Sequence, residues 1–87
     1  MQSKNKPAPT KAERAHIARV ARLSCVVCGA EPVEVHEPKQ GAWFASIALC
    51  VECHRGQHGW HGDRLRWKLN KMDEIDAINE TVRLVSE

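Results

Sequence analysis

The apolar positions near the N-terminus follow a helical period. In the stretch KAERAHIARVARL, Ile17 and Val20 stand three positions apart among alanines. Thr10 comes directly before this stretch, and Glu13 follows three residues later, which is the signature of a capping box. The pattern therefore predicts an α-helix that begins after Thr10.

The middle of the chain has the composition of β-strands. The runs VEVH (33–36) and WFASIAL (43–49) are rich in β-branched and aromatic residues, and the segment between them contains proline and glycine. This pattern predicts a β-hairpin. The following stretch VECHRGQH (51–58) predicts a short helix that Gly59 ends.

The C-terminal part again follows a helical period. Asp73 with Asp76 resembles a new helix N-terminus, so we expect two helices with a bend at 71–73. The predicted apolar stripe consists of Leu65, Leu69, Met72, Ile75, Ile78, Val82 and Val85. We expect this stripe to pack in the core, with an interface between two copies of the chain as the alternative. Trp60 and Trp67 are also expected to be packing residues.

Composition adds four cysteines in two CxxC pairs. Cys25 with Cys28 and Cys50 with Cys53 are separated by 21 residues. A chain of 87 residues forms one domain, and domains of this size often depend on a metal, disulfides or a partner. The chain shows no signal-peptide pattern and no membrane-length apolar run, so we expect a cytoplasmic protein with reduced thiols. The spacing then predicts a closed, structural Zn²⁺ site.

Charge is unevenly distributed, although the net charge is only +2. Residues 1–22 hold six Lys or Arg and one acid, residues 54–71 hold five and one, and residues 72–87 hold one and five. We expect 1–10 to be a flexible basic arm and 11–87 a single domain. The two basic segments are suited to a polyanion, with an ordinary solvated surface as the alternative. The candidate nucleic-acid contacts are Arg19, Arg22, Arg55, Arg64, Arg66 and Lys68.

Three histidines follow the last cysteine within eight residues. His54, His58 and His61 are left over if zinc takes four thiolates, and such a cluster favours a second metal site or a catalytic site. His58 stands four residues after His54, on the same face of the predicted helix. A hairpin strand facing that helix brings His36 and Glu37 opposite His54. A zinc site that uses some histidines in place of cysteines is the alternative that spacing leaves open.

Residues 25–70 resemble a known family. The two CxxC knuckles, the strand VEVH and the stretch LCVECH are similar to the HNH, or His-Me finger, nucleases, whose ββα-metal motif often lies between two CxxC pairs. The continuation CHRG…HGDR resembles the small phage-encoded HNH proteins, including recombination-associated nucleases. The resemblance implies a small α+β fold, with a zinc-stapled ββα-metal core, an N-terminal helix and C-terminal helices.

The resemblance also implies an activity, namely a metal-dependent DNA endonuclease that hydrolyses phosphodiester bonds with a single catalytic divalent ion, Mg²⁺ or Mn²⁺. By this resemblance His54 is a metal ligand and His61 or His58 is the next one. His36 is either the general base or a ligand, and in the second case Glu37 stands where the base should be.

A non-catalytic zinc-binding module for nucleic acid or a protein partner, a degenerate HNH protein, is the alternative function. The asparagine that orients the base in the family should fall near Ala45 or Ser46, and neither position holds asparagine. The expected partners are DNA, whether duplex, single-stranded or branched, and a phage or host protein, with no membrane. A phage-encoded protein would act in the host-cell cytoplasm. The sequence leaves the oligomeric state open.

Overall fold

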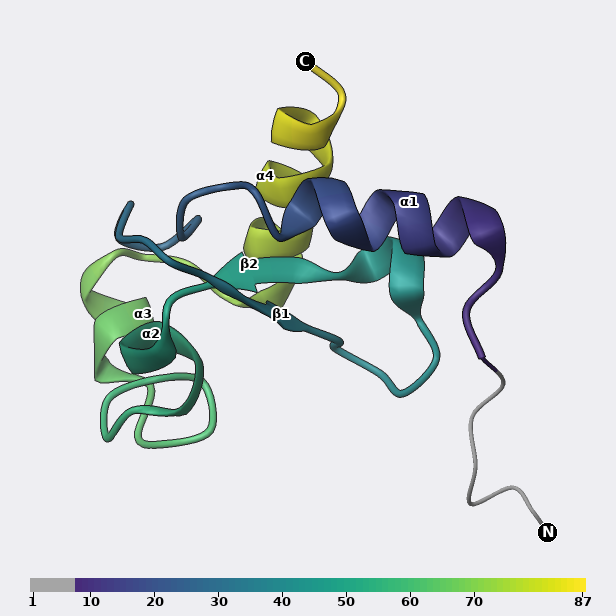
Figure 1. The fold of residues 1–87 in the computed structure, drawn as a ribbon. Helices are drawn as coiled ribbons and strands as arrows, with labels where there is room; N and C mark the ends of the chain where they lie inside the picture. The colour runs from purple at the N-terminus through teal and green to yellow at the C-terminus, as the bar shows by residue number, and fades with distance from the viewer. Residues whose placement is uncertain (1–7) are drawn as a thin grey trace, which may run out of the picture.

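Residues 8–87, the part of the chain that this computed structural model describes, form a small α+β fold around a two-stranded sheet. The elements in chain order are α1 (Lys11–Val20), β1 (Glu34–His36), the 3-10 helix η2 (Trp43–Ala45), β2 (Ile47–Leu49), α2 (Val51–Arg55), α3 (Leu65–Leu69) and α4 (Glu74–Val85). Helix α1 contacts η2 and α4, while α2 and α3 lie at the other end of the hairpin (Figure 1). The predicted basic arm, 1–10, lies mostly outside the described residues.

Helix α1 begins as the capping pattern predicted. Thr10 Oγ1 accepts from the backbone N–H of Glu13 at 3.1 Å, and Glu13 Oε1 accepts from the backbone N–H of Thr10 at 2.7 Å. The buried side of the helix consists of His16 and Val20. The ring of His16 lies 5.4 Å from that of Phe44, which joins α1 to η2. The capping box is therefore confirmed, and the helix ends at Val20.

The predicted hairpin is confirmed, but its strands are short. β1 and β2 pair antiparallel, and His36 lies opposite Ile47. The predicted second strand began at Trp43; instead 43–45 form a 3-10 turn, which the Ser46 hydroxyl closes by donating to the Trp43 carbonyl. All three residues of β2 are fully buried, because α2 and α4 both pack against this strand.

The C-terminal part contains the predicted bend. Asp73 caps α4 through a capping box with Asp76, and Lys71 before it has a left-handed backbone with φ 56°. The predicted packing of the apolar stripe is confirmed only in part, since Met72 and Ile78 pack against the core and other members do not. The bend at Lys71 separates α3 from α4, so a helical period that runs across it does not define one face. The exposed members of the stripe are Leu65, Leu69, Ile75 and Val82. Trp67, which was predicted to be a packing residue, is buried in the core together with Ala77.

The hydrophobic core is small and includes cysteines. Its buried members are Cys25, Val27, Ile47, Leu49, Cys50, Cys53, Trp67 and Ala77. Trp60 packs on Trp67 at its edge, with ring centroids 4.7 Å apart. A domain of this size needs a further source of stability, and the cysteines lie where a metal would supply it. No helix within 8–87 has the length and apolar character that crossing a bilayer requires.

Candidate metal centres

The four cysteines come together from two short turns. Cys25 and Cys28 lie on the turn after α1, while Cys50 is the N-cap of α2 and Cys53 lies within that helix. Gly29 closes the first turn with φ 82°, and its N–H donates to the Cys25 carbonyl at 2.8 Å. A left-handed backbone of this kind favours glycine. Gly29 thus closes the turn of the first CxxC pair.

The sulfur atoms of this cysteine cluster are spaced for one tetrahedral ion. The four Sγ atoms lie within 4.8 Å of one another, and those of Cys28 and Cys50 are 3.6 Å apart. Tetrahedral zinc with Zn–S bonds of about 2.3 Å sets its sulfurs about 3.8 Å apart, whereas a disulfide bond measures about 2.05 Å. All four thiols are free, and no histidine of the described part of the chain joins them. The cluster fits a zinc site made of cysteines alone.

Arg66 of α3 belongs to the cysteine cluster. Its Nε donates to Cys53 Sγ at 3.2 Å, and the neighbouring Trp67 Nε1 donates to the Cys53 carbonyl at 2.8 Å. Burial raises the pKa of the Cys53 thiol. Burial acts in the same direction on Cys28, but hydrogen bonds from the Ala30 backbone and from Arg66 outweigh it and lower the pKa of Cys28 to about 7. Arg66, a predicted nucleic-acid contact, thus places its positive charge against the thiols.

Three histidines from three segments form a second cluster. His36 ends β1, His54 lies on α2, and His61 lies on the loop between α2 and α3. One ring nitrogen of each lies within 4.8 Å of the others. His36 is buried, His54 is half-buried and His61 is exposed, so the histidine cluster opens to solvent on the His61 side.

Two carboxylates fix the orientation of the inner imidazoles. Glu74 Oε2 lies 2.8 Å from His36 Nε2, and Glu34 Oε1 lies 2.8 Å from His54 Nδ1. A carboxylate accepts, so these outer nitrogens carry the ring protons, and in neutral imidazoles the inner nitrogens then hold lone pairs. Those inner atoms, Nδ1 of His36 and Nε2 of His54, are 3.2 Å apart. Two facing lone pairs require a proton or a cation between them.

The spacing of the inner nitrogens suits a metal ion. A tetrahedral site with metal–nitrogen bonds of 2.0–2.1 Å has nitrogens about 3.3 Å apart, close to the 3.2 Å between His36 and His54. Metal-binding histidines characteristically donate their other N–H to a carboxylate. Glu34 and Glu74 occupy those positions, so the donor set fits a divalent ion.

Arg55 holds Glu34 in place. Its Nε and Nη2 form a fork on the two Glu34 oxygens at 2.6–3.1 Å. The Arg55 hydrogen bonds, followed by that of His54, lower the pKa of Glu34 to about 2. The carboxylate therefore stays ionised and available to His54. Arg55 was predicted to contact nucleic acid, and its guanidinium is engaged in this pair.

The loop at 56–64 selects His61 over His58. Helix α2 ends at Arg55, not at Gly59 as predicted, so His58 does not share a helix face with His54. His58 lies outside the histidine cluster, and its Nδ1 is 2.9 Å from an Asp63 carboxylate oxygen. The N–H of His61 donates to the His54 carbonyl at 3.0 Å, which brings the two imidazoles together.

Glycine is required within this loop. Gly59 packs so tightly on α2 that a Cβ there would overlap the Glu52 carbonyl oxygen. A Cβ on Gly62 would overlap the Gln57 carbonyl oxygen. The repeated glycines of GQHGWHG therefore let the loop fold back over the end of α2, which is the condition for the position of His61.

Sequence reasoning missed both carboxylates of the histidine cluster. Glu34 precedes His36 by two positions on β1, and residues spaced by two share a face of a strand, so this signal was present. Glu74 follows His36 by 38 positions and begins another helix, so no local pattern connects them. Glu37, the predicted alternative base, is half-buried just after β1 and belongs to neither cluster of the described residues.

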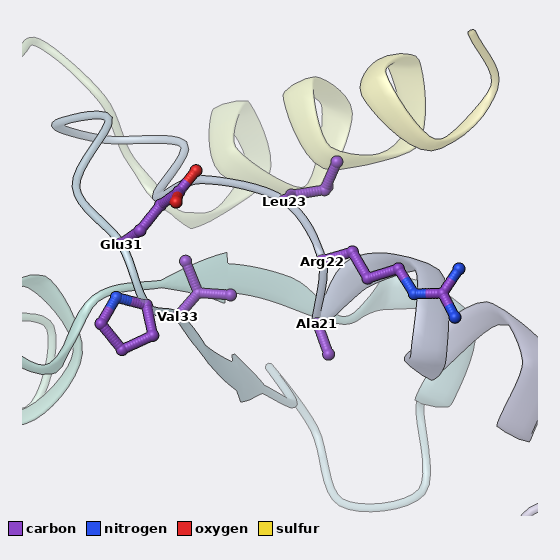
Figure 2. A pocket seen from close by; sticks show the side chains of 6 residues that line it. Ala21, Arg22, Leu23, Glu31 and Val33 are labelled. Atoms are coloured by element: carbon purple, nitrogen blue, oxygen red, sulfur yellow. The ribbon is translucent and has the colours of Figure 1, made fainter.

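The remaining predicted nucleic-acid contacts lie on the surface. Arg19, Arg22, Arg64 and Lys68 are exposed. Arg22 borders an open hollow at the end of α1 (Figure 2), which is lined by Ala21, Arg22, Leu23, Glu31, Pro32 and Val33. That hollow contains no member of either cluster. It offers no group for metal or proton chemistry beyond one carboxylate.

The two clusters differ in the chemistry that they permit. Four thiols around one point form a closed site, which is suited to a structural role. Three imidazoles with an exposed side form an open site, which leaves room for another ligand. Comparison of the chain with protein-family models, curated proteins and solved structures found no match. The function is therefore inferred from the geometry of these two clusters.

Proposed function

We propose that this chain is a metal-dependent endonuclease that hydrolyses DNA phosphodiester bonds, with one divalent ion held by His36, His54 and His61. The observation that carries the proposal is the pair of inner nitrogens 3.2 Å apart on His36 and His54, each ring backed by a carboxylate. Such an arrangement is built for a cation, and the exposed His61 leaves one side open to a substrate.

The surrounding elements support an HNH-type site. His36 comes from a hairpin strand and His54 from the helix that follows the second CxxC pair, so two strands and one helix surround the cluster. This is the order that the resemblance to the HNH nucleases implies. The cysteine cluster, which is placed to bind zinc, ends on the residue before His54 and would stiffen the helix that carries it.

The side chains at the site have two roles, which are holding the ion and accepting a proton. A divalent ion in the histidine cluster would supply Lewis-acid stabilisation of the phosphate. His36 is engaged at both ring nitrogens, which favours the role of ligand over that of general base. Glu37, directly after it, is then the strand-end candidate for the proton acceptor. We expect Glu37→Gln to lower the rate of cleavage while the second ion still binds.

The choice of ion follows from the donor atoms. Imidazole nitrogen suits Zn²⁺, Co²⁺ and Ni²⁺ better than Mg²⁺, which prefers oxygen ligands. Three histidines therefore favour a transition ion, so a test must include such ions beside Mg²⁺ and Mn²⁺. The two metal sites are expected to bind differently, with tight zinc at the cysteines and a more weakly held ion at the histidines.

The direct test is nicking of supercoiled plasmid by zinc-loaded protein, with each of these ions added in turn. We expect nicking by the wild type and its loss in His61→Ala. His58→Gln is the matched control, because His58 lies in the same loop outside the cluster and glutamine keeps a donor for Asp63. Folded, zinc-loaded protein that cleaves DNA with none of the ions would contradict the proposal.

A non-catalytic zinc module is the second candidate, and one observation favours it. Ser46, at one of the two positions where the HNH family carries its asparagine, is fully buried and donates to the Trp43 carbonyl. It is therefore not free to orient a base. This candidate predicts DNA binding that His36→Ala and removal of the second ion leave unchanged, and a gel-shift measurement on that variant separates the two functions.

A further inference from the structure

Arg64 lies on the loop that carries His61, and two contacts with Trp60 hold its guanidinium. Its guanidinium carbon lies 3.6 Å from the centroid of the Trp60 ring, and its Nε donates to the Trp60 carbonyl at 2.8 Å. These two contacts hold the guanidinium over the indole ring. The residue is exposed, and its Nη groups make no hydrogen bond within the described part of the chain. The guanidinium is thus held in place while its Nη groups remain free to donate hydrogen bonds at the surface.

The backbone of Arg64 is held in an unfavourable conformation. Its φ of 66° and ψ of 20° lie in the left-handed region, which non-glycine residues rarely occupy. Strained residues of this kind cluster at functional sites. Position 64 therefore carries a long cationic side chain although its backbone conformation is unfavourable for a non-glycine residue.

Arg64 also lies close to the histidine cluster. Its N–H donates to the Gly59 carbonyl at 3.1 Å, which closes the turn that carries His61. The guanidinium is therefore carried by the same loop as His61, the exposed member of the cluster.

We propose that Arg64 binds a non-bridging phosphate oxygen of the nucleic-acid backbone beside the histidine cluster, with Trp60 as the platform that aims it. A guanidinium presents parallel N–H groups that match phosphate oxygens, and a prior stacking contact removes part of the ordering cost. The proposal rests on the proposed function for the identity of the substrate. It assigns Arg64 a role distinct from Arg55 and Arg66, which are engaged with Glu34 and Cys53.

The test compares Arg64→Gly with Lys71→Gly. Lys71, at φ 56°, is the other non-glycine residue with a left-handed backbone in 8–87, so each substitution removes one positive charge and one strained conformation. Binding of a short fluorescent DNA duplex is measured by anisotropy, without added divalent ion. We expect Arg64→Gly to weaken binding roughly ten- to a hundredfold, and Lys71→Gly about threefold or less. Thermal unfolding verifies that both variants are folded.

Arg64→Lys separates geometry from charge. Lysine keeps the charge but not the planar fork, so we expect it to recover only a minor part of the lost affinity. Equal binding by Arg64→Gly and Lys71→Gly, or full affinity in Arg64→Lys, would overturn the proposal. DNA binding is measured separately from cleavage. If the protein nicks no plasmid but Arg64→Gly still weakens DNA binding, the endonuclease proposal is overturned and the phosphate-binding proposal stands. If the Arg64→Gly variant nicks plasmid normally, the phosphate-binding proposal is overturned and the endonuclease proposal stands.

Discussion

His16 is a buried titratable side chain whose Nε2 has no hydrogen-bond partner in the described residues. Burial, followed by the charge of Arg19, lowers its pKa below the value of about 6.5 expected in the unfolded chain. The unfolded chain therefore takes up this proton first as the pH falls. The stability associated with a neutral His16 is fully present above about pH 6.5 and is lost progressively below it.

We expect the unfolding temperature of the wild type to fall more steeply between pH 7.5 and 5.5 than that of His16→Leu, because leucine cannot be protonated. Thermal unfolding followed by circular dichroism at several pH values measures the difference. The comparison removes the contribution of the other histidines, since both proteins contain them. Parallel curves for the two proteins would show that His16 does not contribute to the pH dependence.

Glu74 acts on the histidine cluster from the start of α4. Its carboxylate accepts from His36 and so keeps the inner nitrogen of that ring available to an ion. Loss of such an outer partner typically costs 10–100-fold in metal affinity. We expect Glu74→Gln to weaken binding of the second ion by about that factor, as measured by titration of zinc-loaded protein with Co²⁺.

Glu80→Gln is the matched control for Glu74, because Glu80 lies on the same helix and pairs with Arg83 on the surface. The two substitutions remove the same charge from α4, and only Glu74→Gln removes the negative charge of the group that accepts from His36. Equal Co²⁺ affinity in the two variants would reject a role for Glu74 in the site.

At the scale of the elements, local sequence signals predicted where helices begin better than where they end. The capping residues Thr10 and Asp73 correctly located the beginnings of α1 and α4, since a cap is a contact between near neighbours in sequence. The end of α2 was misplaced because both Gly56 and Gly59 can stop a helix. The choice between them depends on how the loop packs against α2, which is not a local property.

The same distinction applies to the candidate site. The CxxC spacing and the histidine run identified the four cysteines, His54 and His61, because ligand residue types at short spacing are directly visible in sequence. His36 was assigned through the predicted hairpin, whose strand faces the helix of His54. The exclusion of His58 and the presence of Glu74 depend on tertiary structure. The apolar stripe was only partly correct for a related reason, since the bend at Lys71 changes which face each helix turns inward.

The loop at 56–64 gives an element-scale prediction. We expect Gly59→Ala to displace the loop, because the added Cβ overlaps the Glu52 carbonyl oxygen, and overpacking of this kind costs about 1–3 kcal/mol. His61 should then move away from His54, so the variant should show a lower unfolding temperature and weaker binding of the second ion.

Gln57→Ala is the control for the loop, because residue 57 is exposed and lies in the same segment. Calorimetric unfolding and Co²⁺ titration measure both effects of Gly59→Ala. A Gly59→Ala protein that binds Co²⁺ as tightly as Gln57→Ala would show that the position of His61 does not depend on this close approach.

At the scale of the whole molecule, one short helix connects the two centres. α2 contributes Cys53 to the buried core and His54, the next residue, to the histidine cluster. The cysteine cluster lies inside the core, whereas the histidine cluster lies at its edge with His61 exposed. We therefore expect ion binding at the histidine cluster to depend on the cysteine cluster, and zinc binding at the cysteines not to depend on the histidines.

We expect Cys28→Ser to weaken zinc binding, reduce helical circular dichroism and abolish binding of the second ion, although Cys28 contributes nothing to the histidine cluster. His61→Ala should lose only the second ion and keep one zinc per chain, with an unchanged spectrum. Metal analysis by mass spectrometry under native conditions, together with circular dichroism, measures both variants. Zinc binding supplies folding free energy in small metal domains, so loss of a thiolate should destabilise the whole fold. Loss of an exposed imidazole should affect only the histidine cluster. A Cys28→Ser protein that still binds the second ion with wild-type affinity would show that α2 holds His54 without zinc, and the two centres would then be independent.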